Sequence, residues 1–180
     1  MSDQGLSRPT GGDVIDLILD DHATFEALLR RLRGSHDDRA EALRMLATLH
    51  VAHAEAEESQ VYPKLRRKGV VDEEEAEHGE HEHAEAHQAL LAVMELSSLS
   101  GDQFDAAVEE LTSAISHHLA EEELTILDPA RDDVTPAVRG ELGRAFCEER
   151  NRLIDSDCGT IDVVRDLVDQ AEDDGLIESD

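Results

Sequence analysis

The stretch His53-Ala54-Glu55-Ala56-Glu57-Glu58 decides the fold, because it continues an apolar helical stripe with a histidine and glutamates. The same phrase, His-x-x-x-Glu-Glu, recurs as His118-Leu119-Ala120-Glu121-Glu122-Glu123. Between the two copies lies His83-x-x-x-His87, and His22 lies ahead of the first copy. Four segments therefore offer imidazole or carboxylate groups where core residues are expected. A bundle of four helices would close these groups around metal.

The composition and the spacing of apolar residues predict an all-α protein. Aromatic residues make up only 2% of the chain, and Ala, Leu, Glu and Arg are abundant, which favours helix. Apolar positions recur at steps of three and four, which predicts four long helices joined in an up-down-up-down four-helix bundle. We expect these helices at about 13–33, 38–62, 72–96 and 102–127. Pro63 and Pro129 are expected to stop the second and fourth helices.

The chain divides into three parts in this interpretation. Residues 1–12 are polar and are expected to form a flexible N-terminus, and residues 13–129 form the bundle. Residues 130–180 form a C-terminal extension of one or two helices, expected at about 136–154 and 161–171. We expect the extension to pack on the bundle or at a dimer contact, and the chain to be a monomer or a homodimer.

Charge and hydropathy exclude several partners. Sixteen basic residues against 44 acidic ones leave a formal charge of −28, so nucleic acid is not an expected partner. No apolar run approaches the roughly 20 residues that a membrane span needs, and the N-terminus lacks the pattern of a signal peptide. We therefore expect a cytoplasmic protein without a membrane partner. Cys147 and Cys158 form no Cys-x-x-Cys pair and are expected to be reduced thiols.

Helix geometry predicts which glutamate of each phrase points inward. Residues four apart lie about 40° apart around a helix, whereas residues five apart differ by about 140°. Glu57 and Glu122 are therefore expected to share the inward face with His53 and His118, respectively. Glu58 and Glu123 are expected to point away from this face. The alternative is a local widening of the helix, which would make Glu123 the inward ligand instead of Glu122.

The number of inward donors predicts two metal ions. The predicted metal-binding residues are five histidines and two glutamates: His22, His53, Glu57, His83, His87, His118 and Glu122. They are too many for one tetrahedral zinc, and mixed imidazole and carboxylate donors suit iron. Burying two carboxylates among apolar residues would also be costly without a cation.

The remaining polar residues carry less specific expectations. Four residues are predicted either as alternative metal ligands or as residues that contact the ligands without binding metal: Glu123, Glu58, His50 and Glu26. Glu26 could equally be solvated, and His50 lies about 60° from His53 on the same face. We expect His78, His81 and His117 on the surface, and we expect Tyr62 on the opposite side of the second helix from His53.

The combination of these phrases resembles the hemerythrin-like family, also called the HHE cation-binding domain. The matching phrases are Asp21-His22, His53-x-x-x-Glu57-Glu58 with Tyr62-Pro63, His83-x-x-x-His87, and His118-x-x-x-Glu122-Glu123, which together span 13–129. The resemblance implies a non-haem di-iron centre of two iron ions, bridged by carboxylates and by oxo, hydroxo or solvent. It assigns His83, His87 and His118 to one iron, His22 and His53 to the other, and Glu57 and Glu122 between them.

One departure from the family pattern bears on function. Oxygen-carrying hemerythrins have an aspartate five residues after the fourth-helix histidine, where this chain has Glu123. This difference leaves the fourth-helix bridge open between Glu122 and Glu123. It also relates the chain to the broader HHE group, whose members have varied roles, and not to the dedicated oxygen carriers.

Three functions compete at this stage. The first is a protein that binds and reacts with dioxygen or a related small oxidant, peroxide or nitric oxide. The second is a di-iron oxidase, oxygenase or peroxide-consuming enzyme acting on a small substrate, and the third is an iron-handling or structural metal bundle. Whether the protein is an enzyme, a possible di-iron oxidoreductase, is undecided, and no catalytic residue is assigned. An apolar cap from Phe25, Leu29, Leu111 or Ile115 would favour reversible binding, whereas a substrate-sized pocket would favour catalysis.

Overall fold

The computed structural model describes residues 5–34 and 36–178, and these residues are helical with connecting loops and no strand. The four long helices are α1 (Val14–Leu32), α2 (His36–Ala56), α4 (Glu73–Met94) and α5 (Asp102–Glu122). The C-terminal helices are α7 (Pro136–Asp155) and α8 (Ile161–Asp173). The predicted all-α class is confirmed. Among the described residues, no helix has both the length and the apolar composition that crossing a bilayer requires.

Two long helices continue through widened turns instead of stopping at proline. The π-helical turn η1 (Glu57–Val61) joins α2 to α3 (Tyr62–Arg67), and the π-helical turn η2 (Glu123–Leu127) joins α5 to α6 (Asp128–Asp133). The prediction that Pro63 and Pro129 stop these helices is therefore wrong. Each proline lies in the first turn of the segment after the π-helical turn, where its missing N–H is tolerated.

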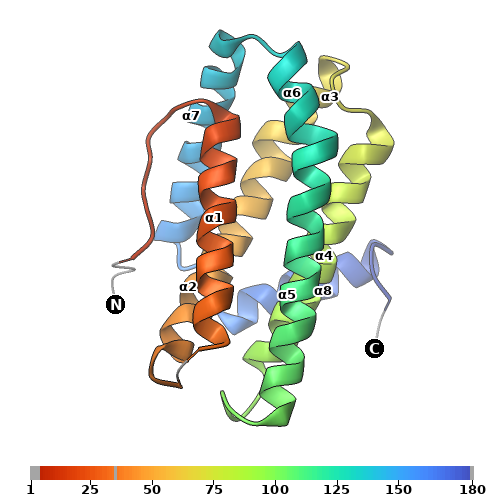
Figure 1. Ribbon diagram of the computed structural model, residues 1–180. Helices are drawn as coiled ribbons and strands as arrows, with labels where there is room; N and C mark the ends of the chain where they lie inside the picture. The colour runs from red at the N-terminus through yellow and green to blue at the C-terminus, as the bar shows by residue number, and fades with distance from the viewer. Residues whose placement is uncertain (1–4, 35, 179–180) are drawn as a thin grey trace.

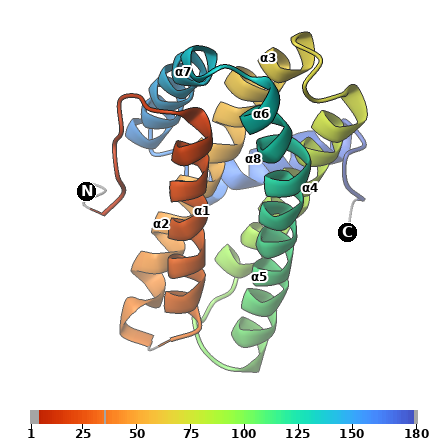
Figure 2. The same cartoon turned by 45° about the horizontal axis from the view of Figure 1, so that its top comes forward.

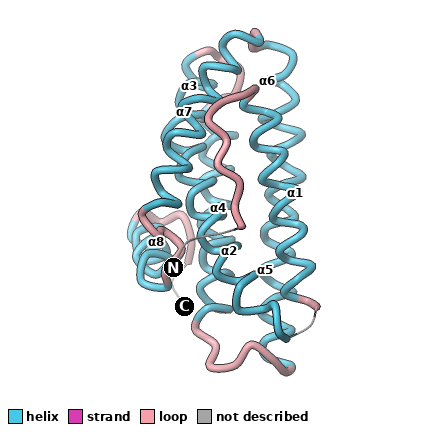
Figure 3. The backbone as a smooth tube through the Cα atoms, turned by 90° about the vertical axis from the view of Figure 1, so that its left-hand side faces the viewer, coloured by secondary structure: helices cyan, strands magenta, loops and turns pink. Residues whose placement is uncertain are grey.

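The helices α1, α2, α4 and α5 stand side by side as a bundle, and the second view shows their shared long axis (Figures 1 and 2). Helix α7 packs along α1 and α2, whereas α8 packs against α4 and crosses the bundle axis (Figure 3). Met1 to Gln4 of the predicted flexible N-terminus lie outside the described residues. The following residues run beside α7, where Ser7 and Pro9 accept hydrogen bonds through their carbonyl oxygens from Arg150 and Asn151.

The apolar core is split into two main clusters along the bundle. One cluster contains Phe25 and Leu111, together with other residues from the halves of α1, α2, α4 and α5 near the loop that joins α4 to α5. The other contains Ile18 and Phe146, and it includes apolar residues of α3, η2 and α7. Cys147 and Cys158 are both buried, and neither forms a disulfide bond. The polar residues predicted to bind metal lie along the helices between these clusters.

Candidate metal centre

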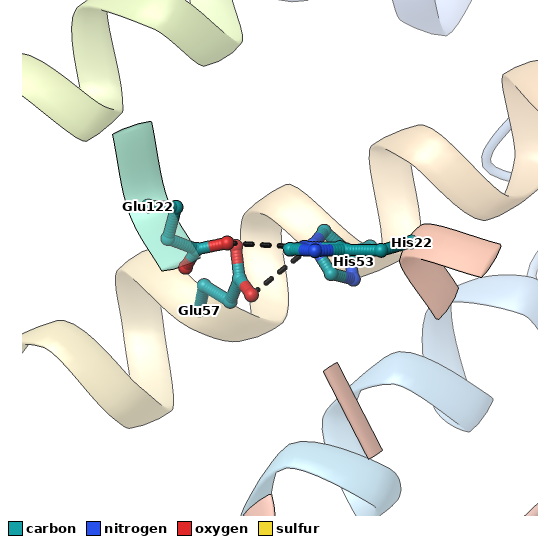
Figure 4. Close-up of side chains that lie close together, drawn as sticks. All are labelled: His22, His53, Glu57 and Glu122. Carbon is teal, nitrogen blue, oxygen red and sulfur yellow. Dashed lines mark hydrogen bonds and ion pairs between the residues drawn. The ribbon is translucent and has the colours of Figure 1, made fainter. Parts of the chain in front are cut away.

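Four of the predicted donors converge from three segments of the bundle. Oxygen or nitrogen atoms of His22, His53, Glu57 and Glu122 all lie within 4.8 Å of one another (Figure 4). The Nε2 atom of His22 is 3.1 Å from Oε2 of Glu122, and Nε2 of His53 is 3.1 Å from Oε1 of Glu57. All four residues are buried. This group therefore combines two imidazoles and two carboxylates shielded from solvent.

A second group shares one carboxylate with the first. Donor atoms of Glu57, His83 and His118 also lie within 4.8 Å of one another. While Oε1 of Glu57 faces His53, its Oε2 lies 3.3 Å from Nε2 of His83. Similarly, Oε2 of Glu122 lies 3.1 Å from Nε2 of His22 and 3.8 Å from Nε2 of His118. Each glutamate thus lies between histidines of the two groups, as a carboxylate that bridges two ions must.

Each of the four histidines in these groups has a further carboxylate at its other ring nitrogen. An ionised carboxylate only accepts hydrogen bonds, so Nδ1 carries the proton and Nε2 is left to face the centre. The four Nδ1 to carboxylate pairs are His53 with Asp21 at 3.2 Å, His118 with Glu82 at 3.0 Å, His83 with Glu58 at 2.7 Å, and His22 with Glu123 at 3.0 Å.

These pairs show what the second glutamate of each repeated phrase does. Glu58 and Glu123 turn aside from the centre, and each reaches a histidine on a different helix. The preceding residue in each phrase, Glu57 or Glu122, is almost fully buried at the centre. The same arrangement occurs twice along the chain. Asp21 directly precedes His22 and orients His53 of the first repeated phrase, and Glu82 directly precedes His83 and orients His118 of the second.

The Nε2 atoms of His53, His83, His87 and His118 are buried and make no hydrogen bond of normal geometry, although those of His53 and His83 lie 3.1 and 3.3 Å from oxygens of Glu57. Buried polar atoms without a partner are rare in proteins because losing water without compensation is costly. Unprotonated Nε2 is also the atom by which imidazole binds transition metals. These four nitrogens, with two carboxylates beside them, therefore fit metal ions.

The structure separates His87 from the two groups. His87 is buried, but it belongs to neither set of donors within 4.8 Å, and its ring centroid lies 4.9 Å from that of His50. His50 itself is buried among the site histidines, with its Nδ1 unpartnered. Glu26 is exposed and pairs with Arg30 at 3.6 Å, so the solvated alternative holds for this residue.

Tyr62 lies at the centre, and the prediction that it points to the opposite side is wrong. Its side chain is fully buried, and its hydroxyl donates hydrogen bonds to Oε1 of Glu122 at 3.0 Å and to Oε2 of Glu57 at 3.4 Å. The expected direction assumed a regular helix after His53. The π-helical turn η1 has more residues per turn, which rotates the residues after it relative to that expectation.

Two residues of α7 support the centre although they lie outside the predicted bundle. Arg150 is 1% exposed, and its guanidinium donates two hydrogen bonds of 2.7 Å to Asp21, the residue that holds His53. The ring of Phe146 meets that of His53 edge-on, with centroids 5.8 Å apart. Sequence periodicity gave no indication of this contact, since Arg150 and Asp21 lie far apart in the chain.

Burial and charge perturb the acid–base behaviour of the metal-free centre. Burial opposes protonation of His53 and His83, but the glutamate and aspartate contacts outweigh it and raise the pKa to about 9 for His53 and about 10 for His83. Burial, reinforced by His83 and His118, lowers the pKa of His87 to about 3. For Glu57, burial is outweighed by His53 and His83, and its pKa lies well below its usual range. Without metal, protons thus occupy part of the donor set.

Taken together, the bundle and its buried histidine and glutamate layer define a helical metal-binding protein. Residues 13–129 match the family model for the Hemerythrin HHE cation binding domain, and the chain belongs to that family. Iron is the metal typical of the family, so the family and the site agree on a metal-binding role. Comparison with curated proteins and with solved structures found no match.

Proposed function

We propose that this protein holds two non-haem iron ions and uses them to bind and react with dioxygen or a related small oxidant, such as peroxide or nitric oxide. The observation that carries the proposal is the convergence of buried imidazole Nε2 atoms, most of them without a hydrogen bond of normal geometry, on two carboxylates. In this proposal His22 and His53 hold one iron, whereas His83, His87 and His118 hold the other. Glu57 and Glu122 lie between the two irons.

The charge around the centre supports two cations instead of one. Six carboxylates contact the site histidines, and they belong to Asp21, Glu57, Glu58, Glu82, Glu122 and Glu123. One of these six, Asp21, is neutralised by its ion pair with Arg150. Two divalent or trivalent ions would balance most of the remaining charge, of which the carboxylates of Glu57, Glu82 and Glu122 are buried.

The surrounding residues prepare the site for small-molecule chemistry. When bound, a pair of irons supplies electrons to a small oxidant together with an open coordination position. The chain itself excludes water by burial, orients the imidazoles through their Nδ1 atoms, and holds the Tyr62 hydroxyl oxygen 3.0 Å from Oε1 of Glu122. Among the described contacts, Tyr62 therefore supplies the hydroxyl group that is hydrogen-bonded to the two proposed bridging carboxylates, Glu122 and Glu57.

The space near the centre favours a small ligand over an organic substrate. A cavity of about 130 Å³ touches His87 and Glu58, and α8 contributes to its wall through Leu167. Sites for drug-sized molecules usually occupy about 300–1,000 Å³, whereas a water molecule in the liquid takes about 30 Å³. A diatomic gas or peroxide fits this volume, which is smaller than the sites that drug-sized molecules usually occupy.

Two features bear on whether the oxidant is released or consumed. The ring centroid of Phe25 lies 5.1 Å from that of His53, and Leu29, Leu111 and Ile115 are buried in the same apolar cluster, which favours reversible binding. The hydroxyl of Tyr62 beside Glu122 favours the alternative, a peroxide-consuming enzyme, because reduction of peroxide to water requires protons. We retain the predicted cytoplasmic location, and a monomer or homodimer, as parts of this proposal.

The decisive experiment loads the metal-free protein with ferrous iron without air, counts bound iron, and then adds dioxygen and peroxide separately. The proposal predicts two irons per chain and a visible absorption change with either oxidant. Reversal of the dioxygen spectrum under vacuum supports binding, and sustained peroxide loss supports the enzyme. His83→Ala combined with His118→Ala should lose iron, whereas His81→Ala, a change at a half-buried histidine on α4 outside both donor groups, should not. One iron per chain, or two irons retained in the double variant, would contradict the assignment.

A further inference from the structure

A short basic run in this acidic chain has no role in the proposed di-iron centre. Four of the sixteen basic residues fall within five positions: Lys64, Arg66, Arg67 and Lys68. No acidic residue interrupts the run, although the chain has 44 acidic residues and a formal charge of −28. The run lies on α3 and its C-terminal cap. Basic residues are favourable beside the C-terminal end of a helix dipole, so this position alone indicates no ligand.

The four basic residues differ in their partners. Arg66 forms an ion pair with Glu73 at the start of α4. Within 5–34 and 36–178, the side chains of Lys64, Arg67 and Lys68 make neither an ion pair nor a hydrogen bond. Three positive charges therefore remain without a protein partner in a chain that is rich in carboxylates.

These three side chains line one pocket of about 330 Å³. The pocket lies between α3 and the first two turns of α7, which are at the same end of the bundle (Figure 2). Its lining residues are Lys64, Arg67, Lys68, Val138, Glu141 and Leu142. The volume falls in the range of about 300–1,000 Å³ that is usual for sites of small molecules.

The lining combines positive charge with an apolar wall. Leu142 belongs to the apolar cluster that contains Phe146, and Val138 packs against that cluster. Glu141 opposes one of the three positive charges, so a net of two positive charges remains. Lysine and arginine are the usual protein ligands of phosphate groups, and a phosphate monoester carries a charge of about −1.5 to −2 near pH 7. An organic dianion with an apolar body therefore matches both parts of the lining.

The acidic residues elsewhere in the chain do not cancel this local charge. At physiological ionic strength, exposed charges separated by more than about 8 Å are largely screened from one another. The potential that a small anion meets in the pocket is therefore set mainly by the residues that line it. Raising the salt concentration should weaken binding, because the lining lysines and arginine are themselves accessible to solvent.

We propose that this pocket binds a small organic dianion of the phosphate monoester class. Lys64, Arg67 and Lys68 bind the charged group, and the apolar body of the ligand lies against Val138 and Leu142. The site does not depend on the proposed reaction with oxidants, because none of its lining residues belongs to either group of buried metal donors.

The test titrates phenyl phosphate into the full chain by calorimetry, with inorganic phosphate and phenol as comparison ligands. Inorganic phosphate has the charge without the apolar body, and phenol has the apolar body without the charge. We expect phenyl phosphate to bind about tenfold more tightly than inorganic phosphate, which is the gain from burying roughly 55 Å² of apolar surface. Phenol should show no binding.

A matched pair of variants separates the pocket from the basic run as a whole. Arg67→Gln should weaken binding of phenyl phosphate by about tenfold or more, because it removes a charged hydrogen-bond donor from the lining. Arg66→Gln makes the same change of charge at the preceding residue, which pairs with Glu73 and does not line the pocket, and it should leave the affinity unchanged. Val138→Thr should reduce the advantage of phenyl phosphate over inorganic phosphate. Thermal melts verify that each variant is folded.

Three outcomes would overturn the proposal. The first is that phenyl phosphate does not bind at millimolar concentration. The second is an equal loss of affinity in Arg66→Gln and Arg67→Gln, which would indicate general attraction to the basic run instead of a defined site. The third is that inorganic phosphate binds as tightly as phenyl phosphate, which would exclude a role for the apolar wall. Loss of affinity in Arg67→Gln alone, with a preference for the organic anion, supports the site.

Discussion

Replacing Arg150 with methionine should destabilise the protein strongly, because it would strand a buried carboxylate. Arg150 is 1% exposed and donates two 2.7 Å hydrogen bonds to Asp21, whose side chain is 7% exposed. Burial raises the pKa of Asp21, but the contacts with His53 and Arg150 outweigh it and keep that pKa below its ordinary value. Methionine retains the apolar stem but removes the guanidinium, so Asp21 would keep only His53 as a partner.

Removing one member of a buried ion pair costs about 3–5 kcal/mol. For a chain of 150–250 residues each kcal/mol lowers the melting temperature by about 2–4 °C, so Arg150→Met should lower it by roughly 6–20 °C. Arg150→Lys should recover only part of this loss, because lysine keeps the charge but cannot form the paired hydrogen bonds. Thermal melts followed by circular dichroism, with and without iron, measure both effects.

The effect should extend to metal binding through His53. Loss of a group that orients a metal ligand typically weakens affinity by about 10–100-fold, and we expect a loss in that range for iron in Arg150→Met. Arg152→Met is the matched control, since Arg152 lies on the same helix but is exposed and pairs with Glu149. If Arg150→Met melts within about 2 °C of the unchanged chain, the stabilising role of α7 is refuted. If it binds iron equally well, Arg150 does not act on the centre.

Three further predictions concern the centre itself. Tyr62→Phe removes the 3.0 Å hydrogen bond to Glu122 and should cost about 1.5–3 kcal/mol in chemical denaturation; an unchanged midpoint would contradict that contact. Gly79→Ala should also weaken this contact, because a Cβ atom would lie 3.1 Å from the Tyr62 ring, and its effect should largely disappear in a Tyr62→Phe background. Metal binding at pH 7 should release about two protons, since the pKa is about 9 for His53 and about 10 for His83, and apparent affinity should therefore rise with pH up to those values. Calorimetry in buffers of different ionisation enthalpy counts these protons, and their absence would show that both imidazoles are already neutral.

The bundle and its inward donors were predictable because both follow from local rules. A helix repeats every 3.6 residues whatever its neighbours are, so apolar spacing reveals the helices and the face on which His53 and Glu57 lie. The same rule predicted Glu57 and Glu122 on the inward face, and in the structure these two are buried whereas Glu58 and Glu123 are partly exposed. The rule failed at Tyr62, where the π-helical turn η1 changes the period that the prediction had assumed.

The sequence alone thus determined the class of fold, the family resemblance and seven of the histidines and glutamates that are buried between the helices. Tertiary structure decided which group each one meets: Glu58 reaches His83, Glu123 reaches His22, and Arg150 reaches Asp21. These contacts depend on the rotation and the axial offset of one helix relative to another. Such offsets result from packing over the whole core, and no spacing within a single helix encodes them.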